Sequence, residues 1–336
     1  MKPRERLLAS LYGEPVDRPA FSLWRHFHEH DATPEGLVDA TVAFVRKWKP
    51  DFVKHTPTGL YAVEDWGLSI RRFDDPHRPP ERLRPLFETP HGWYELDTLD
   101  VEAGALGREL RGLRLLRSKV PDGIPILMTV FSPLTLAYKL VGERVVHDLR
   151  QAPEALHAGL RVIAATAARY VEAVHRAGAD GLFFATQLAT ANMLTREEYA
   201  RFGEPYDRLV LEAWPGGAPL ILHLHGTTTF FDLADAYPVH GVSWHDRETS
   251  PSLAEALSRT TRGLVAGLDR RIFLQGRKAV RLQALDALRA TGGRRHVLAP
   301  SCVLPTQAPD EALVAVVEVI RGGDPADDDD KRTVEA

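Results

Sequence analysis

The sequence predicts an α/β fold in which eight parallel strands close into a (β/α)8 TIM barrel. Three observations support this. A short apolar run, a polar or Gly/Pro break and a longer stretch of helical period repeat along most of the 336 residues. Eight runs have the length of strands, the number that closes into a barrel. No strand is followed by a Gly-x-Gly-x-x-Gly turn, which disfavours the alternative, a doubly wound open sheet.

The elements follow in order along the chain. Residues 4–11 form an amphipathic helical pattern that ends at Gly13-Glu14-Pro15. The expected strands are residues 19–24, 51–56, 125–131, 181–186, 219–225, 241–245, 263–268 and 296–302. The expected helices between and after them include residues 34–48, 153–177, 196–213, 252–259, 279–290 and 310–320. Strands that alternate with helices are joined by right-handed crossovers and therefore run parallel.

Two segments depart from this repeat: one lies within the single barrel domain, residues 1–322, and the other follows it. Residues 61–97 contain Trp66, a Pro/Arg-rich loop and Trp93-Tyr94, so we expect an insertion or lid over the barrel mouth. Residues 323–336 include the run Asp327-Asp328-Asp329-Asp330-Lys331 without apolar side chains, which predicts a disordered acidic tail. That run also spells a protease tag site, so it is either a natural tail or an added tag.

Composition narrows the possible partners. The formal net charge is −4, and both signs are spread along the chain. We therefore do not expect nucleic acid or anionic membranes as partners, and we expect a small-molecule substrate. One cysteine excludes an intrachain disulfide and is expected to stay reduced. The charged amino terminus lacks the apolar core of a signal peptide, and no long apolar span follows, so we expect a cytoplasmic protein.

The stretch Pro219 to Gly226 carries the strongest functional signal. Alternation along a strand places Ile221, His223 and His225 on one face and three leucines on the other. A buried parallel strand is normally apolar throughout, so two imidazoles at its carboxyl end need an explanation. They are either a hydrogen-bonded pair of core histidines or part of a functional site.

Further polar residues follow other predicted strands, where the active site of a TIM barrel lies. In chain order these candidates are Trp24, Arg25, His26, His55, Thr186, His245, Asp246, Arg247 and Cys302. His223, His225 and Cys302 form a three-ligand set suited to Zn²⁺ with an open fourth position. His245 or Asp246 is a further ligand, or the acceptor that fixes the tautomer of a ligand histidine.

Arg25 and the histidines around it form a cationic edge that suits carboxylates or phosphate, and we expect Arg247 to join it. The alternative interpretation is that each arginine pairs at the surface with Glu29 or Glu248, which contributes about 0–1 kcal/mol and no function.

Almost the whole chain, from about Pro3 to Arg321, resembles the uroporphyrinogen decarboxylase superfamily of TIM barrels, which includes zinc-dependent methyltransferases that move methyl groups from corrinoid to thiol. The matching stretches are Arg4-Glu5-Arg6-Leu7-Leu8, Gly13-Glu14-Pro15-Val16-Asp17-Arg18-Pro19, Phe131-Ser132-Pro133-Leu134-Thr135-Leu136, Gly178-Ala179-Asp180-Gly181, Leu222-His223-Leu224-His225-Gly226 and Ser301-Cys302-Val303-Leu304-Pro305.

The resemblance favours the methyltransferase branch over the true decarboxylases. The decarboxylases carry an Arg-Gln-Ala-Gly-Arg stretch after the first strand and an aspartate after the second, where this chain has Trp24-Arg25-His26-Phe27-His28 and His55-Thr56. Tyr138 and Thr186 match the tyrosine and serine of the decarboxylase substrate site. The zinc motif of the methyltransferases matches His223, His225 and Cys302, with a histidine in place of its first cysteine.

Three functional hypotheses follow. The first is a methyltransferase in which zinc at His223, His225 and Cys302 activates a thiol, with a corrinoid protein as methyl donor and a homodimer as the expected assembly. The second is a metal-free decarboxylase of a tetrapyrrole or smaller polycarboxylate, in which Arg25 and Arg247 bind acid groups and His55, His223 or His245 supplies the proton. The third is a corrinoid or tetrapyrrole binder without catalysis.

Overall fold

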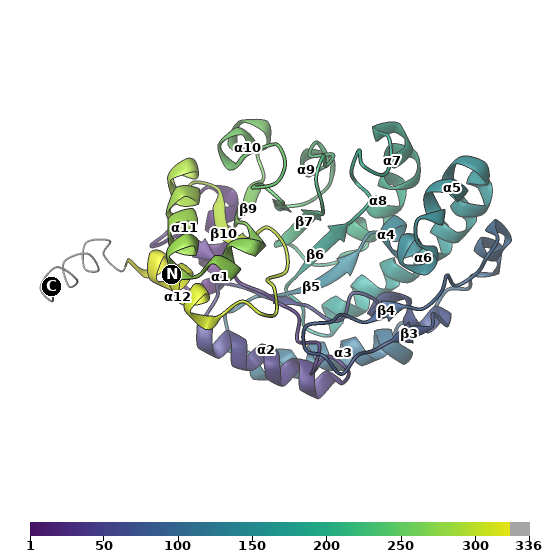
Figure 1. Cartoon of the computed structure of the whole chain (residues 1–336), viewed down its shortest axis with the longest axis horizontal. Helices are drawn as coiled ribbons and strands as arrows, with labels where there is room; N and C mark the ends of the chain where they lie inside the picture. The colour runs from purple at the N-terminus through teal and green to yellow at the C-terminus, as the bar shows by residue number, and fades with distance from the viewer. Residues whose placement is uncertain (323–336) are drawn as a thin grey trace, which may run out of the picture.

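A computed structural model describes residues 1–322 of the chain as a (β/α)8 barrel, as the sequence predicts (Figure 1). The main-sheet strands are β1 Ala20–Phe21, β2 Val53–His55, β5 Ile126–Phe131, β6 Gly181–Thr186, β7 Leu220–Leu224, β8 Gly241–Trp244, β9 Gly263–Leu268 and β10 His296–Pro300. They lie in the order β1-β10-β9-β8-β7-β6-β5-β2, and every ladder between neighbours is parallel. The predicted acidic tail, residues 323–336, lies outside the described residues.

Single hydrogen bonds, rather than a ladder, close the barrel between β1 and β2. The backbone N–H of Asp51 donates to the carbonyl of Phe21 over 2.9 Å, and the N–H of Phe21 donates back to the Asp51 carboxylate over 3.0 Å. The Ser22 hydroxyl donates to the carbonyl of Phe52 over 2.8 Å. Arg6 and Arg18 pair with the fully buried Asp51, so its charge is compensated. The strands therefore form a closed barrel and not an open sheet.

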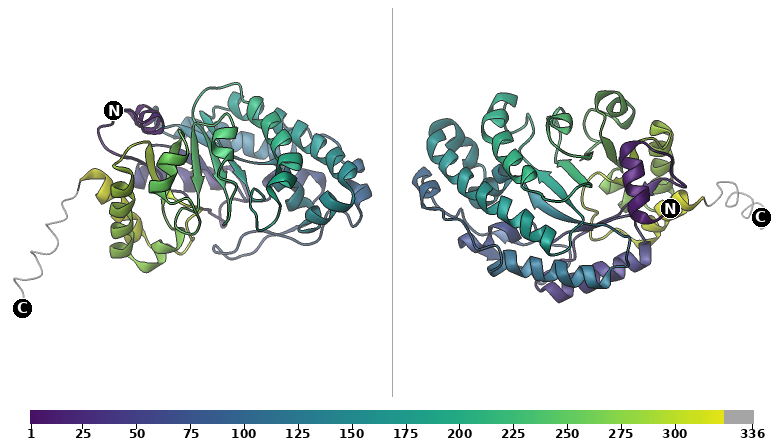
Figure 2. Two further views of the ribbon diagram at one scale, coloured as in Figure 1. Left: turned by 90° about the horizontal axis from the view of Figure 1, so that it is seen from above. Right: turned by 180° about the vertical axis from the view of Figure 1, so that it is seen from behind.

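Helices surround the barrel (Figures 1 and 2). Their bounds are α1 Pro3–Tyr12, α2 Pro34–Trp48, α3 Gly104–Lys119, α4 Pro133–Val141, α5 Arg144–Gln151, α6 Pro153–Arg176, α7 Arg196–Phe202, α8 Glu204–Glu212, α9 Leu233–Ala236, α10 Leu253–Arg259, α11 Arg277–Thr291 and α12 Asp310–Arg321. Within residues 1–322, none of them is both long and apolar enough to cross a membrane.

One predicted helix, residues 196–213, is in fact two. The break between α7 and α8 falls at Gly203, where a Cβ atom would lie 2.6 Å from the Tyr199 ring. Pro205 follows at the start of α8, where its missing N–H costs no hydrogen bond. The close approach to Tyr199 and the proline together bend the chain here.

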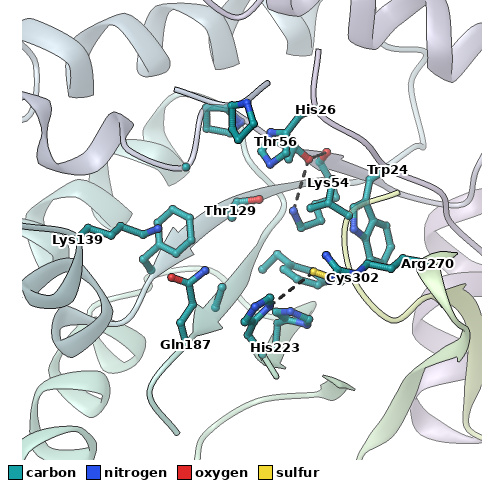
Figure 3. Close-up of a pocket in the computed structure, with 18 of the residues that line it drawn as sticks. Trp24, His26, Lys54, Thr56, Thr129, Lys139, Gln187, His223, Arg270 and Cys302 are labelled. Carbon is teal, nitrogen blue, oxygen red and sulfur yellow. Dashed lines mark hydrogen bonds between the residues drawn. The ribbon is translucent and has the colours of Figure 1, made fainter. Parts of the chain in front are cut away.

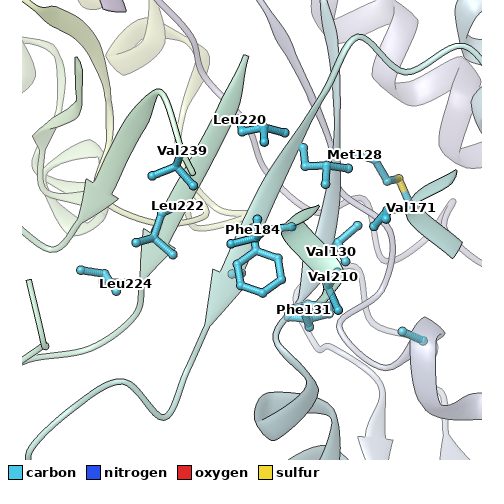
Figure 4. Close-up of a cluster of buried hydrophobic side chains, with 14 of the residues drawn as sticks. Met128, Val130, Phe131, Val171, Phe184, Val210, Leu220, Leu222, Leu224 and Val239 are labelled. Carbon is cyan, nitrogen blue, oxygen red and sulfur yellow. The ribbon is translucent and has the colours of Figure 1, made fainter. Parts of the chain in front are cut away.

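The two faces of each strand pack against different cores. Leu220, Leu222 and Leu224 of β7 pack outward with the layer of helices (Figure 4). Ile221 belongs to a separate cluster inside the barrel. Leu7 and Leu11 of α1 join this inner cluster, so α1 plugs the amino-terminal end of the barrel. The opposite, carboxyl-terminal end is left for the functional site.

Residues 61–97 are largely irregular. They hold the 3-10 helices η1 Tyr61–Trp66 and η2 Pro90–Glu95 and a two-stranded antiparallel ribbon of β3 Ile70–Arg71 and β4 Glu81–Arg82. Between the ribbon strands, His77 lies 2.8 Å from the Thr306 hydroxyl, and Pro79 lines the cavity described below. This part of the segment therefore forms one wall at the barrel mouth.

Candidate metal centre and substrate cavity

A cavity of about 280 Å³ lies at the carboxyl ends of the strands (Figure 3). Aromatic side chains, among them Trp24, Phe131 and Phe183, form part of its wall. Its described lining holds the cations Lys54, Lys139 and Arg270 but no aspartate or glutamate. The cavity is therefore suited to a ligand with both an apolar part and negative charge.

Four potential metal ligands meet on one side of this cavity. One ligand atom each from His223, His225, His245 and Cys302 lies within 4.8 Å of all the others. His223, His225 and Cys302 line the cavity, whereas His245 does not. The predicted three-residue set thus comes together from β7 and the end of β10, and His245, just after β8, joins it. Imidazole nitrogen and thiolate sulfur are ligands that zinc prefers.

Neighbouring polar groups orient two of these rings. The Nδ1 atom of His223 lies 3.1 Å from the Ser243 hydroxyl, and the Nδ1 atom of His245 lies 3.2 Å from the Glu248 carboxylate. The other nitrogen of His245, Nε2, is buried and has no hydrogen-bond partner among the described residues. A buried nitrogen without a partner is costly, and a bound metal ion would satisfy it. The residues present therefore fit a zinc ion.

Burial keeps the three imidazoles neutral. It lowers the pKa of His225 and of His245 to about 4 and that of His223 well below its usual value, and neighbouring positive charges, that of Arg270 among them, act in the same direction. Burial raises the pKa of the Cys302 thiol, whose sulfur lies 3.6 Å from His225 Nδ1. A metal ion would thus find neutral histidines but would have to displace the proton of Cys302.

Three predicted substrate residues lie elsewhere. Arg25 is not among the cavity residues; its guanidinium lies over the rings of Phe27 and Phe44. Tyr138 lies in α4, and the Thr186 hydroxyl is 2.9 Å from the Tyr199 hydroxyl, inside the protein. Trp24 and His26, predicted for the same role, do line the cavity.

His55, Asp246 and Arg247 are also directed away from the cavity. His55 is fully buried, on the face of β2 opposite to Lys54. Asp246 accepts a hydrogen bond from the N–H of Gly267 over 3.1 Å. Arg247 donates to the Gly267 carbonyl and pairs with Asp286, so both residues hold β8 against β9 instead of facing a substrate. The predicted cationic edge of Arg25 and Arg247 is therefore not part of this site.

Sequence reasoning missed Lys54, Lys139, Gln187 and Arg270, all of which line the cavity. A signal existed for Lys54, because a lysine within an apolar strand needs an explanation as much as a histidine does. Alternation from Phe52, which packs inside the barrel, would have placed Lys54 inside and His55 outside.

A parallel barrel whose mouth gathers histidine, cysteine and lysine side chains is the architecture of a TIM-barrel enzyme. The chain belongs to the uroporphyrinogen decarboxylase family: the family description "Uroporphyrinogen decarboxylase (URO-D)" matches residues 2–322. The members of this family that it resembles are enzymes, both methyltransferases and a decarboxylase.

Individual relatives are distant. The methylcobamide:CoM methyltransferase MtbA of Methanosarcina acetivorans is 24% identical over 266 residues, which cover 73% of this chain and 76% of the relative. A uroporphyrinogen decarboxylase of Synechococcus is 25% identical over 88% of this chain and 90% of its own length. A solved methyltransferase from Methanosarcina mazei has the same fold, with a TM-score of 0.83, 21% identity and coverage of 96% of this chain and 98% of its own.

Proposed function

We propose that this protein is a zinc-dependent methyltransferase that transfers a methyl group from a corrinoid, carried by a partner protein, to the thiol of a small anionic substrate. The observation that carries this proposal is the convergence of His223, His225, His245 and Cys302, whose ligand atoms lie within 4.8 Å of one another at the cavity. The similarity to methylcobamide:CoM methyltransferases supports the reaction class.

The roles of the residues follow from their positions. His223, His225 and Cys302 would hold the ion at the cavity wall, and His245 would be a fourth donor whose place the substrate thiol would take. Bound zinc would lower the pKa of the substrate thiol and hold the thiolate. Three neutral imidazoles and one thiolate leave a net charge of +1 at the centre, which favours an incoming anion.

Other cavity residues would bind the remainder of the substrate. The ammonium of Lys54 is buried, and among residues 1–322 its only hydrogen-bond partner is the Thr56 hydroxyl at 3.5 Å. Lys139 and Arg270 add positive charge to the same wall. An anionic group of the substrate would pair with these cations, while Trp24 and Phe183 exclude water from its apolar part.

The cations also favour one alternative, decarboxylation of a polycarboxylate without a metal. Lys54, Lys139 and Arg270 would then bind carboxylates, the role that the sequence assigned to Arg25 and Arg247. The two proposals differ in their need for Cys302, because only the methyltransferase requires a thiolate ligand.

Metal analysis combined with an activity assay tests the proposal. Protein purified without chelators should contain zinc, and Cys302→Ser and His225→Ala should each lower the content by about one ion per chain. His91→Ala, at an exposed histidine, is the matched control and should keep the full content. With methylcobalamin and a panel of anionic thiols, wild-type protein should demethylate the cobalamin and Cys302→Ser should not.

Other results would overturn the proposal. A wild-type protein without zinc that decarboxylates a polycarboxylate, with Cys302→Ser equally active, would establish the alternative. Methylcobalamin that binds without turnover of any thiol in the zinc-loaded protein would indicate a binder.

A further inference from the structure

The loop after β1 holds a second group of metal-ligating side chains that the proposed function does not use. Its sequence, residues 26–31, is His-Phe-His-Glu-His-Asp. One ligand atom each from His26, His28 and Asp31 lies within 4.8 Å of the other two. The side chains of His28 and Asp31 are only 7% and 1% exposed, although they lie in a loop. Such burial of polar side chains requires partners.

The partners within the protein are incomplete. His28 Nδ1 lies 3.3 Å from one carboxylate oxygen of Asp31, and the ring of His28 stacks on that of His26 at 4.9 Å between centroids. The Nδ1 atom of His26, however, is buried and has no hydrogen-bond partner among the described residues. An unpartnered imidazole nitrogen beside a second imidazole and a carboxylate is an arrangement that a cation completes.

We propose that His26, His28 and Asp31 form a second metal site that binds a divalent first-row transition ion. Two imidazoles and one carboxylate are a donor set suited to Fe²⁺, Mn²⁺, Co²⁺ or Zn²⁺, and three protein ligands leave coordination positions open. His26 and His28 line the same cavity as His223, His225 and Cys302. Because β1 and β7 are four strands apart in the eight-stranded barrel, the two sites lie across the cavity from each other.

Arg72 competes with a metal ion for this site. Its guanidinium lies 3.2 Å from the second carboxylate oxygen of Asp31, and its side chain is 36% exposed. A cation that takes up this oxygen must displace Arg72 or share the carboxylate with it. Removal of Arg72 should therefore strengthen metal binding. If Asp31 served only as the ion-pair partner of Arg72, removal of Arg72 would not increase the affinity for metal.

Cobalt titration separates the two sites. Apo protein is titrated anaerobically with Co²⁺, while equilibrium dialysis gives the total cobalt bound and near-ultraviolet absorption reports the cobalt–thiolate bond to Cys302. We expect two ions per wild-type chain, only one of which gives the thiolate band. His28→Ala and Asp31→Asn should each lose one ion and keep the band, while Cys302→Ser should lose the band and keep one ion.

Two further variants make the test specific. His30→Ala, at an exposed histidine of the same loop, should still bind two ions. Arg72→Gln should bind cobalt at the second site about two- to fivefold more tightly. Circular dichroism of every variant shows whether the barrel is folded.

The outcomes are distinguishable from those of the proposed function. One ion per wild-type chain, with the thiolate band and with no change in His28→Ala or Asp31→Asn, would overturn this inference and leave the zinc centre intact. A different result is that wild-type protein binds cobalt without giving a thiolate band, and loses this binding in His28→Ala. That result would support the second site and contradict the zinc centre at Cys302.

Discussion

Lys54 brings a positive charge into a cavity wall whose described residues include no carboxylate. Burial lowers its pKa to about 7, because no counter-ion compensates the ammonium, and proximity to Cys302 acts weakly in the other direction. An anionic substrate would supply the missing charge. We therefore expect Lys54→Met to raise KM for an anionic thiol about 10- to 100-fold, the effect of losing a charge-assisted hydrogen bond of about 1.5–3 kcal/mol.

The comparison with a neutral thiol of the same size makes this prediction specific. KM for the neutral thiol should hardly change, and zinc content should stay at the wild-type level. Lys47→Met, at a lysine 52% exposed, serves as the control. An equal rise in KM for both thiols would mean that Lys54 supports packing and does not bind the anion.

Single residues were the hardest feature to predict. The candidate ligands His223, His225 and Cys302 can be recognised in the sequence, because imidazole and thiol groups stand out at the ends of apolar strands. Arg25 and Arg247 were assigned to substrate because they follow strands, but one packs on aromatic rings and the other pairs with Asp286. Sequence order says which end of a strand a residue lies near, while its direction beyond the strand depends on contacts made by distant segments.

At the scale of elements, alternation along parallel strands accounts for most of the site. All eight predicted strands are present, and the ends of each lie within about three residues of the prediction. The register between neighbouring strands then decides which side chains lie close enough to orient one another. In the β7–β8 ladder His223 pairs with Ser243, which brings the hydroxyl within 3.1 Å of the imidazole. This support could not be predicted without the ladder register.

The β7–β8 register leads to a prediction for metal affinity. Ser243→Ala removes the group that orients His223, and loss of such a contact typically weakens metal binding 10- to 100-fold. Zinc affinity, measured by competition with a chromophoric chelator, should fall by about tenfold, while the number of zinc ions bound at saturation stays the same. Ser258→Ala, on the solvent side of α10, should have the wild-type affinity. Unchanged affinity in Ser243→Ala would show that the imidazole is held by packing alone.

At the scale of the whole molecule, the amino-terminal end of the barrel is closely packed and the carboxyl-terminal end holds the cavity. At the amino-terminal end, α1 fills the barrel so closely that a Cβ atom on Gly263 would lie 2.7 Å from the Leu11 backbone. The ion pairs of Asp51 with Arg6 and Arg18 fasten the seam between β1 and β2 near this end. At the carboxyl-terminal end, His26 Nδ1 in the cavity lining and His245 Nε2 next to the other candidate ligands are buried and have no hydrogen-bond partner among the described residues. Packing and ion pairs at the amino-terminal end stabilise the fold, so the carboxyl-terminal end can keep polar groups whose hydrogen bonds only a ligand completes.

Buried histidines should make the whole fold sensitive to acid. Burial lowers the pKa of His55 and of His296 to about 4, whereas each histidine in the unfolded chain has a pKa near 6.5. Their contribution to stability is thus fully present above pH 6.5 and is lost as the pH falls towards 4, because the unfolded chain takes up protons that the folded protein excludes. The free energy of unfolding in urea should therefore decrease from pH 7.5 to pH 5.

His55 allows this explanation to be tested at one residue. Neither of its ring nitrogens has a hydrogen-bond partner among the described residues, so His55→Leu should leave stability at pH 7.5 unchanged or raise it by about 1 kcal/mol. At pH 5 the gain over wild type should be about 2 kcal/mol larger, because the variant no longer excludes that proton. His91→Leu, at an exposed histidine, should follow the wild-type curve. If His55→Leu and wild type lost stability in parallel between the two pH values, protonation of other groups would be the cause of the acid sensitivity.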